Sequence, residues 1–260
     1  YIIIFLFLII LILTFTLYNV LGTHYLEQSN INEALNCYNK SIELYQKINE
    51  NVEIAYPLNN IATVFAEFLN DNAKAREYFE KSLQINLANN MVEGISSCYD
   101  NLGETHRLED NYTQALEYYF KCEEQARESE LNSLLFTVNK NIMLAYLEVD
   151  EYQKSYEYLL KVTQEMEKNS DRGHDLQIFY EYAARYYFEI GCFEEAKAMA
   201  LKGINTCKKS STKESLTLNC LVLLSEHYTS SRNDSELLFQ NALTLLKNYE
   251  CCSTIKERRD

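Results

Sequence analysis

The 260-residue sequence predicts an all-α fold, an α-solenoid of about six antiparallel helix pairs. The first observation is a recurring triplet: a small residue, a ring or aliphatic residue four positions later in most copies, and a small residue or valine three after that. Its six copies are Ala34-Tyr38-Ser41, Ala75-Phe79-Ser82, Ala115-Tyr119-Cys122, Ser155-Leu159-Val162, Ala196-Ala200-Gly203 and Ser235-Phe239-Ala242. Successive copies begin 39 to 41 residues apart. A fixed period of this size indicates one supersecondary unit stacked repeatedly.

A second signature lies upstream of each of the first five triplets and supplies the other helix of the pair. In the first copy it reads Tyr18, Leu21, Gly22 and Tyr25, with apolar spacings of three and four that are typical of one helix face. The small residue at the Gly22 position lets the partner helix approach closely. No stretch shows the two-residue alternation and Gly-rich turns of β-hairpins, which is the third observation in favour of an all-α fold.

Turn chemistry separates the two helices of each pair. Four pairs of residues resemble capping boxes that open the second helix: Asn30 with Glu33, Asn111 with Gln114, Asp150 with Gln153, and Asn233 with Glu236. The chain has one proline, Pro57, placed where it can begin the second repeat's first helix without breaking a hydrogen bond.

These signatures divide the chain into repeats over residues 18–250, preceded by a hydrophobic segment at 1–17 and followed by 251–260, which we expect to begin a further helix or linker. The six predicted repeats cover approximately 18–50, 57–90, 98–130, 138–170, 179–210 and 220–250. The sixth copy departs most from the pattern, since it fits only if Leu224, Ser225 and Tyr228 take the first-helix positions.

The repeats resemble tetratricopeptide repeats. The residues that carry the resemblance are Leu21-Gly22, Tyr25, Ala34, Tyr38 and Ser41 in the first copy, and Leu102-Gly103, Ala115 and Tyr119 in the third. The copies are about forty residues long instead of thirty-four, a long form similar to that of bacterial signalling proteins and some adaptor scaffolds. The resemblance implies a right-handed superhelix whose first helices line a concave groove.

Residues 1–13, YIIIFLFLIILIL, contain no side chain more polar than a phenol. A segment that is apolar on every side is either buried or in lipid, so residues 1–17 predict a membrane anchor that is shorter than a full span. The competing interpretations are the core of a signal peptide, which lacks the small-x-small cleavage site, and a buried N-terminal cap. The eight scattered cysteines favour a cytoplasmic repeat region, whether or not the anchor is present.

A net charge of −14 excludes a nucleic-acid partner, because phosphate binding requires clustered Lys and Arg. Acidity favours a protein or peptide partner that is basic or amphipathic. No phosphate-binding loop, nucleophile motif or metal-ligand spacing occurs, so the sequence predicts no enzyme activity, no cofactor and no metal.

Three asparagines occupy the position before the Leu-Gly pair, which the resemblance places on the inner surface of the groove: Asn60, Asn101 and Asn141. An amide both donates and accepts, so a ladder of such groups could bind the backbone of an extended peptide. The charged residues expected along the same groove are Glu27, Glu67, Arg107, Glu148, Arg185 and Glu189. The competing interpretation is that the asparagines only stabilise local structure.

Two functions follow from these observations. The first is a protein-interaction scaffold that binds a peptide or partner protein in the concave groove. The alternative, by analogy with proteins that carry similar repeats, is a sensory or regulatory region of a larger bacterial signalling protein whose output domain is a diguanylate cyclase or histidine kinase.

Overall fold

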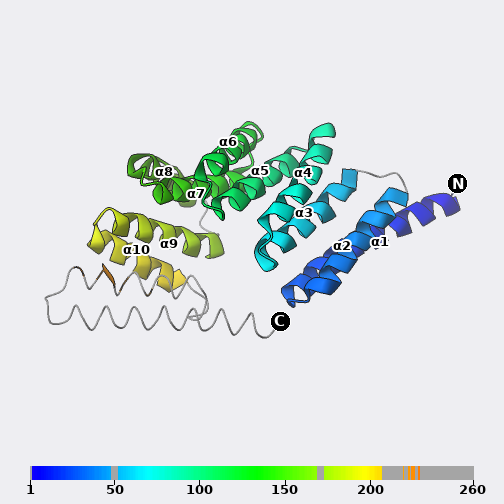
Figure 1. Cartoon of the computed structure of the whole chain (residues 1–260), viewed down its shortest axis with the longest axis horizontal. Helices are drawn as coiled ribbons and strands as arrows, with labels where there is room; N and C mark the ends of the chain where they lie inside the picture. The colour runs from blue at the N-terminus through cyan, green and yellow to red at the C-terminus, as the bar shows by residue number, and fades with distance from the viewer. Residues whose placement is uncertain are drawn as a thin grey trace. The chain divides into compact units, whose positions relative to one another are not determined.

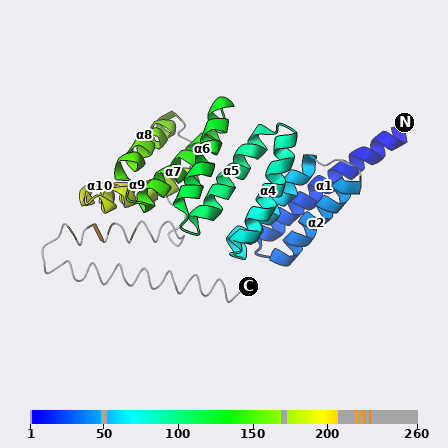
Figure 2. The same ribbon diagram turned by 45° about the horizontal axis from the view of Figure 1, so that its top comes forward.

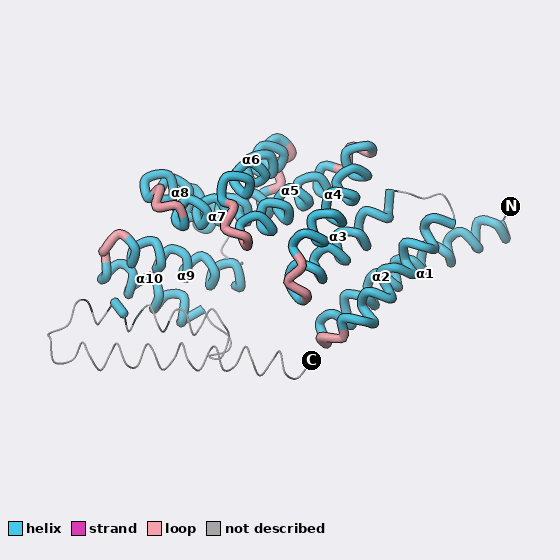
Figure 3. Tube along the Cα trace, in the orientation of Figure 1, coloured by secondary structure: helices cyan, strands magenta, loops and turns pink. Residues whose placement is uncertain are grey.

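In the computed structural model, the chain is described for residues 2–47, 52–168 and 173–206, and at the isolated positions 219, 222, 224, 225 and 228. These residues form helices and turns and no strand, which confirms the all-α prediction (Figure 3). Apart from the isolated positions, the predicted sixth repeat at 220–250 and the tail at 251–260 lie outside the described residues.

The described helices follow one another in antiparallel pairs joined by short turns (Figures 1 and 2). They are α1 (Ile2–Glu27), α2 (Ile31–Lys47), α3 (Ala55–Thr63), α4 (Asn72–Ala88), α5 (Val92–Arg107), α6 (Tyr112–Glu128), α7 (Asn132–Glu148), α8 (Tyr152–Lys168), α9 (Gly173–Glu189) and α10 (Phe193–Thr206). A 3₁₀ turn, η1 (Val52–Ile54), precedes α3, and a π-helical turn, η2 (Val64–Phe68), follows it. Two compact units divide the chain between Asn141 and Ile142, and each is described by itself below.

The recurring triplet supplies the core in both units. Its first residue, at Ala34, Ala75 and Ala115 in unit 1 and at Ser155 and Ala196 in unit 2, is completely buried in every described copy. A side chain this small lets the backbones of the paired helices approach closely. The second residue fills the space beside that contact, and it is a buried ring in Tyr38, Phe79 and Tyr119.

Two glycines of the upstream signature face these rings. A Cβ atom built on Gly22 would lie 2.5 Å from Tyr38, and one built on Gly103 would lie 2.5 Å from Tyr119. Both distances are far shorter than any van der Waals contact. The small residue therefore stands here to admit the ring of the second helix, as the sequence pattern indicates.

The core of unit 1 is a strip shared between neighbouring pairs. Phe15 of α1 packs with Tyr45 of α2 and with Leu58 of α3, and its ring meets Tyr45 edge to face at 4.5 Å between centroids. Further along, Ala62 of α3 packs with Phe79 of α4 and Leu102 of α5 in one cluster. Because each cluster joins one pair to the next, the repeats stabilise one another as in a solenoid.

Six interhelix turns share one geometry with a left-handed residue just past the helix end. These residues are Ser29, Asn90, Asp110, Glu130, Asp150 and Gly191. Around Asp110, its amide donates to the Arg107 carbonyl at 3.0 Å, and the amide of Asn111 donates to the His106 carbonyl at 2.9 Å. This is the Schellman arrangement, which satisfies the last carbonyls of a helix.

The structure confirms two of the predicted helix caps and contradicts a third. Asn30 and Asn111 cap their helices, and their side-chain Oδ1 atoms accept from the amides of Glu33 and Gln114. The prediction that Asp150 caps α8 is wrong: Asp150 is the left-handed turn residue, and its side chain accepts from the hydroxyl of Tyr152 at 2.7 Å. The Asn233 pair lies outside the described residues.

The predicted membrane anchor at 1–17 gains no support. Within the part of the chain that the structure describes, no helix is both long and apolar enough to cross a membrane. Residues from Ile2 onward belong to α1 itself, the first helix of the first pair. Phe15 is completely buried, and its carbonyl accepts from the Ser41 hydroxyl of α2 at 3.1 Å. This end of the segment therefore packs within unit 1.

Candidate functional site

The three predicted asparagines lie on the first helices of unit 1 and bond to the first helix of the preceding pair. Asn60 donates to the Oδ1 of Asn19 at 3.0 Å. Asn101 donates to the Oδ1 of Asn59 at 3.1 Å, and Asn141 donates to a carboxylate oxygen of Asp100 at 2.9 Å. We call these six residues the amide ladder. Its bonds tie α1 to α3, α3 to α5, and α5 to the part of α7 that belongs to unit 1.

The ladder continues from one first helix to the next because α3 and α5 each contribute two adjacent residues to it. Asn59 and Asn60 are neighbours in sequence, and so are Asp100 and Asn101. Consecutive residues of an α-helix project about 100° apart around the axis. One member of each pair can therefore face the preceding first helix while the other faces the following one.

The ladder leaves hydrogen-bonding capacity on each asparagine that donates. A primary amide has two N–H donors and one carbonyl acceptor. Asn60, Asn101 and Asn141 each use one N–H within the protein and make no further hydrogen bond to any described residue. All three side chains are half-buried. Each amide is thus held in one orientation with an acceptor and a donor still available.

Asp100 is the charged member of the ladder, and its surroundings disfavour its charge. Burial raises its pKa from 3.8 to about 6. The Asn141 amide and the positive charge of Lys140 partly oppose this rise, whereas the neighbouring Glu104 adds to it. A carboxylate buried with one amide donor is a site where a cation would be favourable.

Glu104 lies one turn further along α5 and is compensated. Arg107 donates to both of its carboxylate oxygens, at 2.6 and 2.8 Å, and the Tyr119 hydroxyl donates at 2.9 Å. Burial alone would raise the pKa of Glu104, but these donors outweigh it and hold the pKa below its usual value. The same contact and burial raise the pKa of Tyr119, which remains a neutral donor.

Arg107, predicted to lie along the groove, forms an ion pair with Glu104. Glu67, in η2, is exposed, and partial desolvation together with the negative charge of Glu104 raises its pKa. Glu27 is also exposed and lies 3.6 Å from His24 on the same helix. Unit 1 thus gathers Glu67, Asp100 and Glu104 along the first helices.

The other predicted groove residues belong to unit 2. Glu148 of α7 and Arg185 of α9 form an ion pair at 2.8 Å, so they link two successive first helices. Glu189 is exposed at the end of α9. Glu148 thus neutralises Arg185, as Glu104 neutralises Arg107.

Sequence reasoning missed the acceptors of the ladder and the neighbouring half-buried acid, namely Asn19, Asn59, Asp100 and Glu104. A signal for the acceptors was present, because Asn or Asp precedes two of the predicted asparagines directly. Asn19 lies 41 residues before Asn60, which is the repeat period.

The ladder predicts unequal costs for removing its donors. Asn60→Ala loses a bond to a neutral amide, worth about 0.5–1.5 kcal/mol, whereas Asn141→Ala strips the only amide donor from a buried carboxylate, worth about 1.5–3 kcal/mol. We expect Asn141→Ala to be the more destabilising at pH 7.5, measured by urea denaturation, and the gap to shrink at pH 5, where Asp100 is protonated. Equal costs at both pH values would contradict this account of the ladder.

Comparison with known proteins agrees with this architecture. A family model described as tetratricopeptide repeat matches residues 13–88. No curated protein matches the sequence.

Solved structures with the same fold cover almost the whole chain. The aspartyl phosphate phosphatase F of Bacillus subtilis is 16% identical with a TM-score of 0.72, over 95% of this chain and 63% of that one. The apo form of RapI is 17% identical with a TM-score of 0.71, over 95% and 67%. The Rap conjugation gene regulator of the plasmid pLS20, solved with the Phr* peptide, is 15% identical with a TM-score of 0.68, over 96% and 70%. At these identities the likeness concerns the fold.

The recurring triplets, the glycines that admit the rings and the family match lead to one conclusion: residues 13–88 are tetratricopeptide repeats, and the chain shares the helical-repeat fold of these solved structures.

Proposed function

We propose that the chain is a protein-interaction scaffold and that the first-helix face of unit 1 binds an extended peptide. The observation that carries the proposal is the amide ladder, whose three donor asparagines keep an acceptor and a donor unused. Their spacing follows the repeat, so successive amides can bond to successive stretches of one peptide backbone.

The ladder also supplies preorganisation. A flexible amide must lose rotamer freedom when it binds, at a cost of about 0.5–1.5 kcal/mol for each side chain. Asn101, fixed by its bond to Asn59, has already lost that freedom in the folded protein. Binding at such a residue therefore retains more of the hydrogen-bond energy.

The charge of the face favours a basic residue in the peptide. Asp100 is half-buried with only the partial compensation of Lys140, and Glu67 is exposed near Glu104. A lysine or arginine of the ligand placed near Asp100 would favour its ionised form and lower its pKa. Binding of a basic peptide should accordingly strengthen as the pH rises through about 6.

Among proteins of the same fold, the pLS20 regulator was solved with a peptide and another Rap protein was solved with the competence and sporulation factor. This supports peptide binding as a use to which the fold is put. No observation on the described residues favours the alternative of a sensory region in a larger signalling protein, so we propose the scaffold role alone.

The test starts from random peptides displayed on phage and selected on the wild-type chain. We expect the selected peptides to be rich in Lys or Arg, and their affinity, measured by fluorescence anisotropy, to fall about fivefold or more in Asn101→Ala, since leaving a desolvated backbone group unpaired costs about 1–3 kcal/mol.

Asn89→Ala provides the matched control. Asn89 also donates one intramolecular bond, to the Ile85 carbonyl at 2.8 Å, but it lies at the exposed end of α4 outside the ladder. Circular dichroism should report the same helicity for both variants. Selected peptides that bind Asn101→Ala and Asn141→Ala as tightly as the wild type would place their site elsewhere and refute the proposal.

A further inference from the structure

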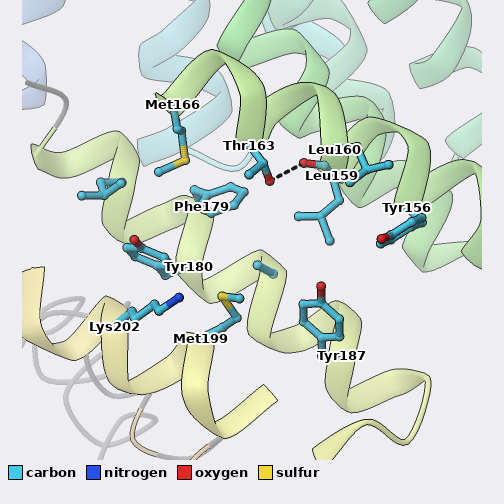
Figure 4. A pocket seen from close by; sticks show the side chains of 12 residues that line it. Tyr156, Leu159, Leu160, Thr163, Met166, Phe179, Tyr180, Tyr187, Met199 and Lys202 are labelled. Atoms are coloured by element: carbon cyan, nitrogen blue, oxygen red, sulfur yellow. Dashed lines mark hydrogen bonds between the residues drawn. The ribbon is translucent and has the colours of Figure 1, made fainter. Parts of the chain in front are cut away.

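Unit 2 contains an apolar cavity of about 420 Å³ that the peptide-binding proposal does not use. Three successive helices line it, with α9 between α8 and α10 (Figure 4). Leu159 and Phe179 are almost completely buried, whereas Leu160 at the rim is 43% exposed. A cavity of this size falls in the range of small-molecule sites, about 300–1,000 Å³.

The residues between α8 and α9 are more apolar than those at the α4–α5 contact two repeats earlier. In α4, Asn86 lies against Gly94 of α5 and donates to Ser82, and these polar side chains line a smaller cavity of about 180 Å³ at that contact. Eighty residues further on, Val162 and Met166 occupy the positions of Ser82 and Asn86. An unbranched thioether and a valine cannot bond across the gap, and apolar surface is left open.

The polar groups around the cavity are few, and one of them, the Thr163 hydroxyl, donates to the Leu159 carbonyl at 2.8 Å. Among the residues that the structure describes, Lys202 of α10 is the one charged residue of the lining, and in Figure 4 its ammonium group points toward the space between Tyr180 and Met199. Lys202 has no ion-pair partner among the residues that the structure describes. The hydroxyl groups of Tyr156 and Tyr187 likewise make no hydrogen bond to the described part of the chain.

From this arrangement we propose that the cavity binds a small amphiphilic carboxylate, with an aliphatic body against Leu159, Phe179 and Met199 and its anionic head at Lys202. Charge complementarity selects the head group: among the described residues Lys202 is the charged group of an otherwise mostly apolar lining, and its ammonium favours an anion at that point. The cavity volume favours a body of about ten carbons over a folded partner. The site is separate from the amide ladder, so either proposal can fail without the other.

The test uses the absence of tryptophan from the chain. Leu160→Trp, at the exposed rim, introduces the only tryptophan, and 11-bromoundecanoate is the probe because its bromine quenches indole fluorescence on contact. We expect saturable quenching below the micelle concentration, reversed by decanoate. Leu108→Trp, a comparably exposed position in unit 1, is the matched control. Equal quenching of both variants, or quenching of neither, overturns the proposal.

Lys202→Gln in the Leu160→Trp background tests the head group. An ion pair at a partly exposed site is worth about 0.2–1 kcal/mol, so bromoundecanoate should bind about two- to fivefold more weakly. The neutral 11-bromoundecanol should be unaffected. Lys161→Gln, on α8 but outside the lining, should change neither probe. Equal effects of Lys202→Gln on acid and alcohol, or no effect on either, would refute anion recognition by Lys202.

Discussion

Replacing Gly103 by alanine is expected to destabilise unit 1 by about 1–3 kcal/mol, the range for overpacking a close contact. In an ordinary helix interior the same change would stabilise by about 0.5–1 kcal/mol. The contact reverses the sign, because the new methyl group would lie 2.5 Å from the Tyr119 ring and 3.2 Å from the Ala115 carbonyl oxygen. Tyr119 is completely buried, and moving it would also break its bond to Glu104.

Urea denaturation followed by circular dichroism measures this effect, and a double-mutant cycle assigns it. In a Tyr119→Ala background the ring is gone, so adding Gly103→Ala should cost little or stabilise. Gly191→Ala is the comparison, since nothing lies within 4 Å of that position and only its left-handed backbone, with φ of 79°, opposes a side chain. If Gly103→Ala costs the same in both backgrounds, the ring contact does not explain the glycine.

The close helix contact at Gly103 could be predicted from the repeat pattern of the sequence alone. A buried small residue must recur at the period of the repeat if helix pairs are to stack, so the triplets and the Leu-Gly signature locate the core. The turns were less predictable. Asp150 and Asn111 both come just before a helix, whose first backbone amides need acceptors. Asp150 nevertheless adopts φ of 60°, whereas Asn111 caps its helix. The left-handed turn residue and the N-cap residue are adjacent in these turns, and a short polar side chain suits either position.

The site followed from sequence only in part. Repeat spacing placed Asn60, Asn101 and Asn141 on equivalent helix positions, but their partners lie about forty residues away and depend on how adjacent first helices rotate against one another. The two arginines expected to interrupt an acidic groove, Arg107 and Arg185, are each neutralised by a nearby glutamate. Net charge along a sequence cannot reveal such pairing, since it is fixed by the stacking of helices.

The second large effect concerns the buried charge of Asp100. Its pKa in the folded chain, about 6, lies above the ordinary 3.8, so the folded state holds a proton that the unfolded state releases. Its contribution to stability is complete below pH 3.8 and is lost as the pH rises through 6. Above that pH the ionised group costs roughly 2–3 kcal/mol, at ~1.4 kcal/mol for each tenfold change in proton affinity.

Asp100→Asn removes this cost while the new side chain still accepts from Asn141. We therefore expect the variant to be more stable than the wild type at pH 7.5, by about 2 kcal/mol after loss of the attraction to Lys140, and equally stable near pH 4. Asp110→Asn, which removes one negative charge at an exposed turn, separates this effect from net charge. If Asp100→Asn and Asp110→Asn change the free energy of unfolding by the same amount at every pH, burial of Asp100 carries no cost. A gain confined to Asp100→Asn above pH 6 would show that the ionised carboxylate destabilises unit 1 at the centre of the proposed peptide-binding face, where a basic ligand would offset that cost.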